Sequence, residues 1–316
     1  MWNSDDKMLQ EEVYRLFESE IENWQLARNK YADLEASVSK RIEFGDFGID
    51  VVCNPARIRS TMAEVQRKLE KMRHLPNNSL AAAAVDSSND SCFLCSDRRP
   101  KEQKSIVVGD FEVLVNPYPI FPIHFTIVYK KHIPQQILPY FDEYLYFARN
   151  LTNFAVFFNG ANCGASAPFH LHFQAAEKRY FNVVGDYSTL PRRYFETVEQ
   201  DDKLTLTSIR NYLRKAFVIS TADPLRAKAV LQKYFMPYIT DNMLNLICCY
   251  EDGQYRIFVF PRKKFRPWQF FEEDPQKRLA ISPASVEMSG CFVTIFREHF
   301  DRLDANEIVD IYSQIS

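Results

Sequence analysis

Hydrophobic and polar positions follow two different periods along the chain, and the change of period separates an N-terminal region from the rest. Residues 6–40 repeat apolar side chains every three to four positions, which predicts one or two amphipathic helices. A strand-like run, GIDVVC, follows at 48–53. The segment NPARIRS then opens with a proline turn and continues as a helix, with Ser60 or Thr61 near its cap. Residues 75–91 are small and polar, which is typical of a mobile connection.

From residue 91 the pattern changes to short β-rich runs separated by turn residues. Three runs predict an antiparallel meander, a 3.6-residue period predicts a helix packed on it, and two further strands are joined by the loop ANCGASAP. These elements are expected at 106–110, 111–117 and 124–132, then 137–154, then 154–160 and 169–177. A helix on one face of such a sheet makes an α+β unit.

The rest of the chain loosely repeats this order. Residues 180–240 are mixed, with a helix near 223–236, and β-rich runs return before a last helix at 305–315. The returning runs lie at 243–250, 254–265 and 286–296. We therefore expect a duplicated, diverged half, although no strict repeat period is present. The predicted domains are an N-terminal helical region at 1–90, a catalytic half at 91–180 and a second half at 181–316.

Composition and charge exclude several classes of protein. The chain has 316 residues, 46% of them apolar, and a net charge of −2, whereas proteins that bind nucleic-acid backbones carry clustered positive charge. No apolar run is long enough for a membrane span, and the start lacks the pattern of a secretory signal. Seven cysteines, an odd number, fit reduced thiols better than a disulfide framework. We expect a soluble cytoplasmic protein that binds neither nucleic acid nor membrane.

The strongest chemical signal is the run FHLHFQ at 169–174. Alternate side chains of a strand share a face, so His170, His172 and Gln174 are expected to line up above an apolar floor. A neutral imidazole is a competent nucleophile towards phosphorus, and an amide can donate to a phosphate oxygen. Packing alone would explain one histidine, but it is a poor explanation for this whole pattern.

FHLHFQ resembles the histidine-triad superfamily with its third histidine replaced by glutamine. This variant is that of galactose-1-phosphate uridylyltransferases, diadenosine tetraphosphate phosphorylases and GDP-L-galactose phosphorylases. The stretch at 116–135 is similar to the same branch, and the stretch at 281–303 resembles the C-terminal segment of GDP-L-galactose phosphorylases, so that the likeness spans 91–313. NPARI and CFLC together are also similar to a bacterial branch of the superfamily.

The resemblance implies HIT-like antiparallel sheets with packed helices, as two diverged halves that follow the N-terminal helical region. It implies that His172 is the covalent nucleophile, with His170 and Gln174 beside it in the catalytic site. Glutamine at the last position is associated with transferases and phosphorylases rather than hydrolases. The expected reaction moves a nucleoside monophosphate from a nucleotide sugar or dinucleoside polyphosphate to phosphate or a sugar phosphate.

Several residues are candidates for binding the nucleotide. Arginines beside a helix N-terminus suit an anion, and uridylyltransferases have similar arginines on an N-terminal strand. The candidates are Arg57, Arg59, Asn116, His124, Gly164 and Ser166. Uridylyltransferases place Gly-x-Ser directly before Pro-His, whereas here Phe169 follows Pro168, so the assignment of Ser166 is shifted by one residue. The arginines could also be ordinary surface residues, Asn116 a turn residue before Pro117, and His124 a histidine with a purely structural role.

The pair Cys92 and Cys95 supplies two ligands for tetrahedral zinc, which needs two more. His132 and His170 are the candidates, and the resemblance to uridylyltransferases implies a structural zinc on such a set. A thiol pair also serves redox chemistry or packing.

Two basic clusters complete the candidates. Arg98 and Arg99 could form a further anion clamp, and RKKFRPW at 262–268 could receive the acceptor phosphate, or be a solvated face. Two alternatives to the transferase stay open at this stage, a nucleotide hydrolase and a nucleotide-binding sensor or scaffold without turnover. Relatives are often dimers, so a homodimer is also open.

Overall fold

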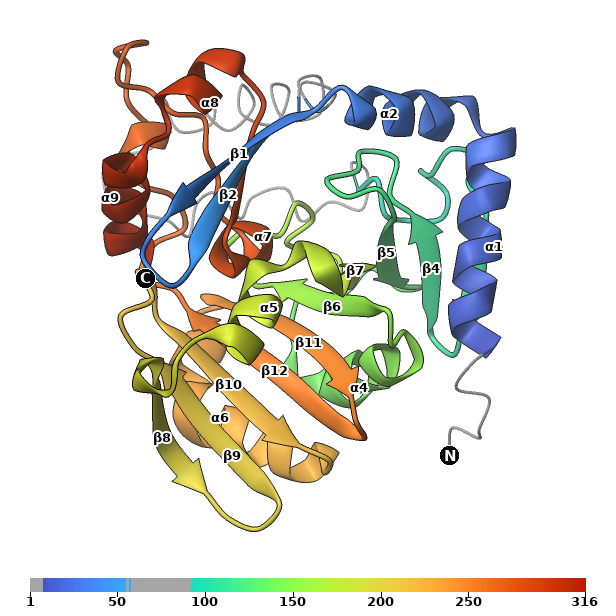
Figure 1. Cartoon of the computed structure of the whole chain (residues 1–316). Helices are drawn as coiled ribbons and strands as arrows, with labels where there is room; N and C mark the ends of the chain where they lie inside the picture. Colours follow the sequence, from blue (N-terminus) through green and yellow to red (C-terminus); the bar gives the residue numbers. More distant parts are fainter. Residues whose placement is uncertain (1–7, 55–56, 58–91) are drawn as a thin grey trace.

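A computed structural model describes residues 8–54, 57 and 92–316 (Figure 1). The predicted helix after Asn54, with Arg59, and the predicted connection at 75–91 lie outside the described residues. The helices are α1 (Met8–Asn23), α2 (Gln25–Glu35), α4 (Phe141–Asn150), α5 (Asn182–Thr189), α6 (Pro224–Thr240), α7 (Ser285–Ser289), α8 (Arg297–Arg302) and α9 (Ala305–Ile315).

Thirteen strands lie in the described residues. They are β1 (Val38–Glu43), β2 (Gly48–Cys53), β3 (Ser105–Val108), β4 (Phe111–Val115), β5 (His124–Tyr129), β6 (Phe154–Asn159), β7 (His172–Glu177), β8 (Phe195–Gln200), β9 (Leu204–Ile209), β10 (Ala216–Thr221), β11 (Leu244–Glu251), β12 (Gln254–Pro261) and β13 (Cys291–Thr294). Short 3₁₀ turns occupy Leu138–Tyr140, Lys178–Tyr180, Arg192–Tyr194 and Trp268–Phe270.

The central sheet shows the predicted duplication. Its ten strands are ordered β3-β4-β5-β7-β6-β11-β12-β10-β9-β8, and every pairing within it is antiparallel. In each half three strands, a helix and two strands follow one another in sequence, and the sheet order of the second half reverses that of the first. The expected α+β fold with two diverged halves is thus confirmed.

The two halves meet where β6 pairs with β11. Asn159 is opposite Asn245 in this pair, and Phe157 is opposite Ile247. The first half joins β6 to β7 by a twelve-residue loop, residues 160–171, whereas the second half joins β11 to β12 by a tight turn at Asp252 and Gly253. The second half keeps the framework of the first, but β12, its counterpart of β7, contains no histidine.

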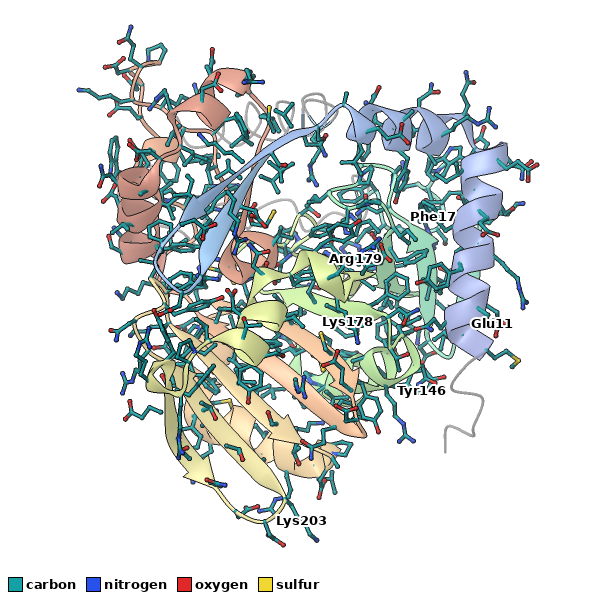
Figure 2. The ribbon with its side chains drawn as sticks, in the orientation of Figure 1. Glu11, Phe17, Tyr146, Lys178, Arg179 and Lys203 are labelled. Atoms are coloured by element: carbon teal, nitrogen blue, oxygen red, sulfur yellow. The ribbon has the colours of Figure 1, made fainter. Side chains whose placement is uncertain are left out.

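Each face of the sheet is covered by a separate hydrophobic core. One core contains Phe173 of β7 and Phe158 of β6 together with buried residues of α1, α2, α4 and α6. On this side Phe17 of α1, labelled in Figure 2, meets Phe125 of β5 at a ring-centroid distance of 6.3 Å. The other core contains Phe157 of β6 together with residues of β2, β13, α5, α8 and α9. The alternation along β6 and β7 divides their side chains between the two cores.

The N-terminal region contains strands as well as the predicted helices. The run GIDVVC forms β2 at the predicted positions, and β2 pairs with β1 in antiparallel and with β13 in parallel orientation. A three-stranded sheet therefore joins the start of the chain to its end, as the blue and red elements show in Figure 1. Among the described residues no helix combines the length and the apolar character that a membrane crossing requires.

Two predicted strands differ from the structure. The run VEMSGCFVTIF begins as helix α7, because Glu287 accepts the backbone N–H of Ala284 at 2.8 Å and Gly290 ends the helix at φ +111°. The strand β13 starts only at Cys291. The other predicted strand, at 169–177, starts only at His172. The residues before it leave the strand, and His170 turns towards Cys92.

Candidate nucleotidyl-transfer and metal site

His172 is the first residue of β7 and follows the long loop of the first half, residues 160–171. It is opposite Val128 of β5, and Gln174 is opposite Thr126. His172 and Gln174 share a face of the sheet because they are two positions apart. Asn116 reaches the same face, where its Nδ2 donates to Thr126 Oγ1 at 3.3 Å. His172 is only 2% exposed. With Gln174, Thr126 and Asn116 it forms a polar strip on an otherwise apolar sheet face.

The hydrogen bonding of His172 decides which ring nitrogen keeps a free lone pair. Nδ1 lies 2.8 Å from the carbonyl oxygen of His170, so Nδ1 carries the proton and donates it to this oxygen. The lone pair of the neutral ring is then on Nε2. Burial lowers the pKa of His172 to about 4, so the imidazole is neutral at neutral pH.

The amide of Gln174 has its orientation set by His124. The backbone N–H of Ile120 donates to His124 Nδ1 at 3.3 Å, which leaves the ring proton on Nε2. Nε2 then donates to Gln174 Oε1 at 2.9 Å. Burial lowers the pKa of His124 to about 3, so this arrangement does not titrate near neutral pH. The amide NH2 of Gln174 is the end left to donate to a ligand.

One residue at this site was not selected from the sequence. Gln135 is 1% exposed, and its side-chain amide bonds both backbone groups of His172. Gln135 follows His132 by three positions in the segment after β5, so the segment supplies both a metal-cluster histidine and a support for His172. A glutamine in a loop carries no sequence pattern that distinguishes it from a solvent-exposed one.

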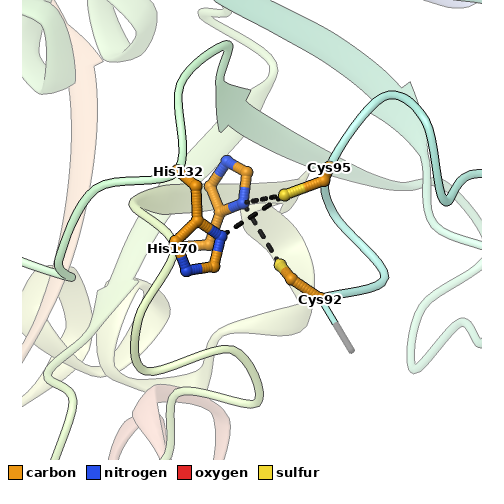
Figure 3. Close-up of side chains that lie close together, drawn as sticks. All are labelled: Cys92, Cys95, His132 and His170. Atoms are coloured by element: carbon orange, nitrogen blue, oxygen red, sulfur yellow. Dashed lines mark hydrogen bonds between the residues drawn. The ribbon is translucent and has the colours of Figure 1, made fainter. Parts of the chain in front are cut away.

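Cys92, Cys95, His132 and His170 form one cluster that could hold a metal ion (Figure 3). Their ligand atoms all lie within 4.8 Å of one another. The Sγ–Nδ1 distances are 3.3 Å for Cys92–His170, 3.3 Å for Cys95–His132 and 3.6 Å for Cys95–His170. Tetrahedral zinc with ordinary Zn–S and Zn–N bonds separates a sulfur from a nitrogen ligand by about 3.6 Å. The donor set and its spacing therefore fit zinc.

His170 belongs to this cluster and lies before the start of β7. Its Nε2 is 2.7 Å from the carbonyl oxygen of Tyr129, so Nε2 carries the proton and the Nδ1 lone pair faces the cysteines. The prediction that His170 lies on the same strand face as His172 and Gln174 is therefore wrong. His170 precedes the strand and turns its ring towards Cys92 and Cys95. The carbonyl oxygen of His170 still accepts the hydrogen bond of His172 Nδ1, so His170 connects the cysteine–histidine cluster to His172.

The small-residue loop has a fixed conformation at Gly164. Gly164 has φ +113°, a region that favours glycine, and a Cβ at this position would lie 2.4 Å from the Cβ of Ala284. Ser166 is exposed, two residues further along the loop. Gly164 is thus pressed against the segment before α7 of the second half.

The candidate basic residues have different surroundings. Arg57 Nη1 donates to the carbonyl oxygen of Tyr118 at 3.4 Å, and the charge of Arg57 contributes to the lowered pKa of His124 after burial itself. Arg57 is therefore near the polar strip. Arg99 forms a largely buried ion pair with Glu112 of β4, and Arg98 forms an exposed one with Asp97, so each already has a protein partner.

The basic cluster at 262–268 is a solvated face only in part, with Lys263, Lys264 and Trp268 exposed and the two arginines buried. Arg262 and Arg266 are 2% and 8% exposed. The expectation of an acceptor-phosphate site is not supported at Arg262, because all five of its N–H groups donate to protein oxygens.

The fold is similar over nearly its whole length to that of yeast Ap4A phosphorylase Apa2. The Apa2 structure in complex with AMP has a TM-score of 0.57 and 16% identity, over 97% of this chain and 94% of that chain. The structure with Ap4A has a TM-score of 0.56 and 16% identity, over 97% and 96%. A third Apa2 structure has a TM-score of 0.59 and 14% identity, over 98% and 97%.

The sequence comparisons divide the chain in two. Residues 189–316 match the family model described as GDPGP1-like, C-terminal domain, and no curated protein matches the chain. With the Apa2 fold, this confirms the resemblance to the HIT-like branch of uridylyltransferases and phosphorylases. Residues 16–177, half of the chain, match the family model described as Domain of unknown function (DUF4922), and the chain therefore belongs to the DUF4922 family.

Proposed function

We propose that the protein is a nucleotidyl phosphorylase or transferase in which His172 Nε2 carries the nucleotidyl group between two half-reactions. The single observation that carries this proposal is the hydrogen bond from His172 Nδ1 to the carbonyl oxygen of His170. It holds a buried neutral imidazole with the Nε2 lone pair available, beside an amide whose NH2 is free to donate. These are the two groups that attack on phosphorus requires.

In the first half-reaction Nε2 forms a bond to the α-phosphorus of the donor. The bond from that phosphorus to the bridging oxygen breaks, and the distal phosphate group leaves with the electron pair. The ring becomes a cation that keeps its Nδ1 proton, and the His170 carbonyl accepts that proton in a shorter, charge-assisted hydrogen bond. The Gln174 amide donates to a phosphorus-bound oxygen, where negative charge develops.

In the second half-reaction an oxygen of the acceptor attacks the same phosphorus, and the N–P bond breaks. The electron pair returns to Nε2, and the ring is neutral again. Inorganic phosphate as the acceptor makes the enzyme a phosphorylase, a sugar phosphate makes it a transferase, and water makes it a hydrolase. The glutamine at 174 favours the first two, as in the family that the sequence resembles.

A dinucleoside polyphosphate is the preferred donor in this proposal. Structures of the yeast phosphorylase with the same fold contain Ap4A and AMP. Nucleotide sugars stay in the proposal as second donors because the C-terminal half matches a GDPGP1-like domain. Arg57, Asn116, His124, Gly164 and Ser166 would line the nucleotide site, together with Arg59.

Zinc fits the cluster of two cysteines and two histidines, and we propose it as a structural ion. When bound there it neutralises the thiolates and fixes the segments at 92–95, 132 and 170 relative to one another. The residues of the chain then carry the chemistry, since His170 would hold its carbonyl oxygen in place to orient His172.

The test is intact-protein mass spectrometry after incubation with Ap4A, or with a panel of nucleotide sugars, in the absence of phosphate. The expected result is a mass gain of one nucleotidyl group, a nucleoside monophosphate less one water, that is absent from His172→Ala. The matched control is His299→Ala, because His299 is also a buried histidine but lies in α8 of the second half. It should form the adduct like the wild type.

Added inorganic phosphate should then remove the adduct and release a nucleoside diphosphate. Release of nucleoside monophosphate in buffer alone would show a hydrolase. The absence of an adduct with donors that bind would refute the proposal and leave a sensor or scaffold.

A further inference from the structure

The strands β6 and β7 separate at the end that carries His172. Their pairing begins at Phe154 with Glu177 and continues to Phe157 with Gln174. The next two pairs in this register would be Phe158 with Phe173 and Asn159 with His172, and both are absent from the ladder. The long loop that contains Gly164 begins at the same point.

The side-chain amide of Gln135 lies where the Asn159–His172 pair would form. Its Oε1 accepts the backbone N–H of His172 at 2.8 Å, and its Nε2 donates to the carbonyl oxygen of His172 at 2.9 Å. The same Nε2 donates to the carbonyl oxygen of Asn159 at 3.0 Å. One side chain thus replaces a neighbouring strand and joins the first residue of β7 to the last residue of β6.

A second set of hydrogen bonds continues from Asn159 into the other half. The Oδ1 of Asn159 accepts from Asn245 Nδ2 at 2.9 Å, from Ser285 Oγ at 2.7 Å and from the Ser285 N–H at 2.8 Å. Asn245 Nδ2 also donates to the carbonyl oxygen of Cys163 at 2.8 Å, inside the loop. Asn245 is 0% exposed, so no solvent is available to replace the partners that its amide finds here.

Arg262 determines the direction of this set. A guanidinium only donates, and its Nη1 donates to Asn245 Oδ1 at 2.7 Å. The Asn245 amide must therefore turn its NH2 towards Asn159 and Cys163. The remaining N–H groups of Arg262 donate to the carbonyl oxygens of Pro283, Ile315, Lys264 and Phe265. All five acceptors of Arg262 are uncharged carbonyl or amide oxygens, so its role is to hold these oxygen atoms in place.

We infer that Gln135 and Arg262 are positioning residues for His172, acting through the continuous set Arg262–Asn245–Asn159–Gln135. The second half of the chain has no catalytic histidine, and in this inference it supports the nucleophile of the first half. The inference rests on the proposed function of His172. A nucleophile displaced by about 1 Å from a productive position loses on the order of 100-fold in rate.

The test uses two variants of the full chain. Gln135→Met keeps the length of the side chain and removes its amide. Asn245→Asp keeps an acceptor for Arg262 and removes both donors to Asn159 and Cys163. Each should lower the rate of adduct formation at saturating Ap4A on the order of 100-fold, while the Kd of Ap4A changes by less than about threefold.

The matched control is Asn150→Ala. Asn150 is also a buried amide, 4% exposed, but it lies before the opposite end of β6, and its Nδ2 donates to the Tyr146 carbonyl oxygen. It should lower the melting temperature and leave the rate of adduct formation at the wild-type value. A purely structural role for Gln135 would give the same pattern as Asn150, and that result would overturn the inference.

A second readout does not depend on activity. Hydrogen exchange of the backbone N–H of His172 should accelerate in Gln135→Met and in Asn245→Asp, and not in Asn150→Ala. Wild-type protein that forms no adduct would refute the proposed function alone, because the exchange result still tests the support of His172. Unchanged exchange in both variants would overturn the inference even if the wild type forms the adduct.

Discussion

His124 Nε2 lies 2.9 Å from Gln174 Oε1, and this contact decides which end of the Gln174 amide is left for a ligand. His124 itself has its proton placed by the N–H of Ile120. Three groups from β7, β5 and the turn before β5 therefore cooperate to present one NH2. A glutamine without this partner would spend part of its time with its oxygen towards the phosphate, where it would repel negative charge.

Replacing His124 by phenylalanine should therefore slow nucleotidyl transfer while the fold persists. The ring volume stays similar, but the amide loses the donor that fixes it. We expect a fall in adduct formation of about tenfold, which corresponds to one hydrogen bond. Stopped-flow or quenched-flow mass spectrometry measures it, and His299→Phe is the control. The pKa of His124, about 3, predicts that this residue adds no acid limb to the pH–rate profile above pH 4. A rate equal to the wild type would show that the amide is held by something else.

Metal removal should destabilise the protein. Because the unfolded chain lacks the cluster, bound zinc stabilises by linkage, by about 4 kcal/mol at a free concentration a thousandfold above Kd. We expect one zinc per chain by elemental analysis, and a lower melting temperature after chelation. The double variant Cys92→Ser, Cys95→Ser should bind none and should not respond to chelator. Cys291→Ser is the control, since Cys291 lies in β13 outside the cluster. Full zinc binding by the double variant would disprove the ligand assignment.

Arg57 should contribute to binding of the donor more than to the chemical step. Its charge acts on His124 and on Glu287, so it lies between the polar strip and α7. Hydrogen bonds to charged groups contribute about 1.5–3 kcal/mol, so Arg57→Ala should raise the donor KM roughly 10- to 100-fold. Steady-state kinetics with the donor varied would measure it. Arg210→Ala removes a guanidinium that pairs with Glu196 on the surface, and its KM should stay at the wild-type value. Equal KM values in the two variants would place Arg57 outside the site.

Gly164 should not tolerate a side chain. Both its φ of +113° and the 2.4 Å approach to Ala284 oppose a Cβ. Gly253, in the corresponding turn of the second half, has φ +76° but nothing within 4 Å. Gly253→Ala therefore measures the cost of the backbone conformation alone, about 1–2 kcal/mol. Gly164→Ala should cost more in unfolding free energy and should also slow adduct formation. Equal effects of the two substitutions would show that the loop moves away from Ala284 to make room for the added Cβ.

Glu287 should make stability depend on pH. Burial raises its pKa from 4.5 to about 7, against the hydrogen bonds that its carboxylate accepts from backbone N–H groups. Between these two values the folded protein binds a proton that the unfolded chain does not. Its contribution is therefore fully present below pH 4.5 and is lost as the pH rises through 7, by roughly 3 kcal/mol.

Urea unfolding at pH 5 and pH 8 measures this contribution as the difference between the wild type and Glu287→Gln. The variant should lose less stability over this range than the wild type does. Glu251→Gln is the control, because Glu251 is held by ion pairs with Lys178 and Arg256 and its removal should not flatten the profile. Identical slopes for the wild type and Glu287→Gln would contradict the raised pKa.

The sequence by itself determined many of the strands and helices and the chemistry of the central run. Periodicity located β2 and α9 at their observed positions, because one buried face leaves a regular trace in the order of side chains. The repeated element order predicted the two halves, and FHLHFQ with its family resemblance selected His172. Cysteine spacing with two histidines predicted the cluster that the structure assembles.

Only the tertiary structure decided how these parts support one another. The ring nitrogen of His172, the orientation of Gln174 and the face to which His170 turns all depend on partners far away in sequence. The sequence around Gln135, Asn245 and Arg262 does not predict their roles. A polar residue can lie in a loop, on a surface or in a buried set of hydrogen bonds without any difference in the neighbouring sequence. Their roles arise because burial requires every polar atom to find a partner, and the fold alone determines which partner is near.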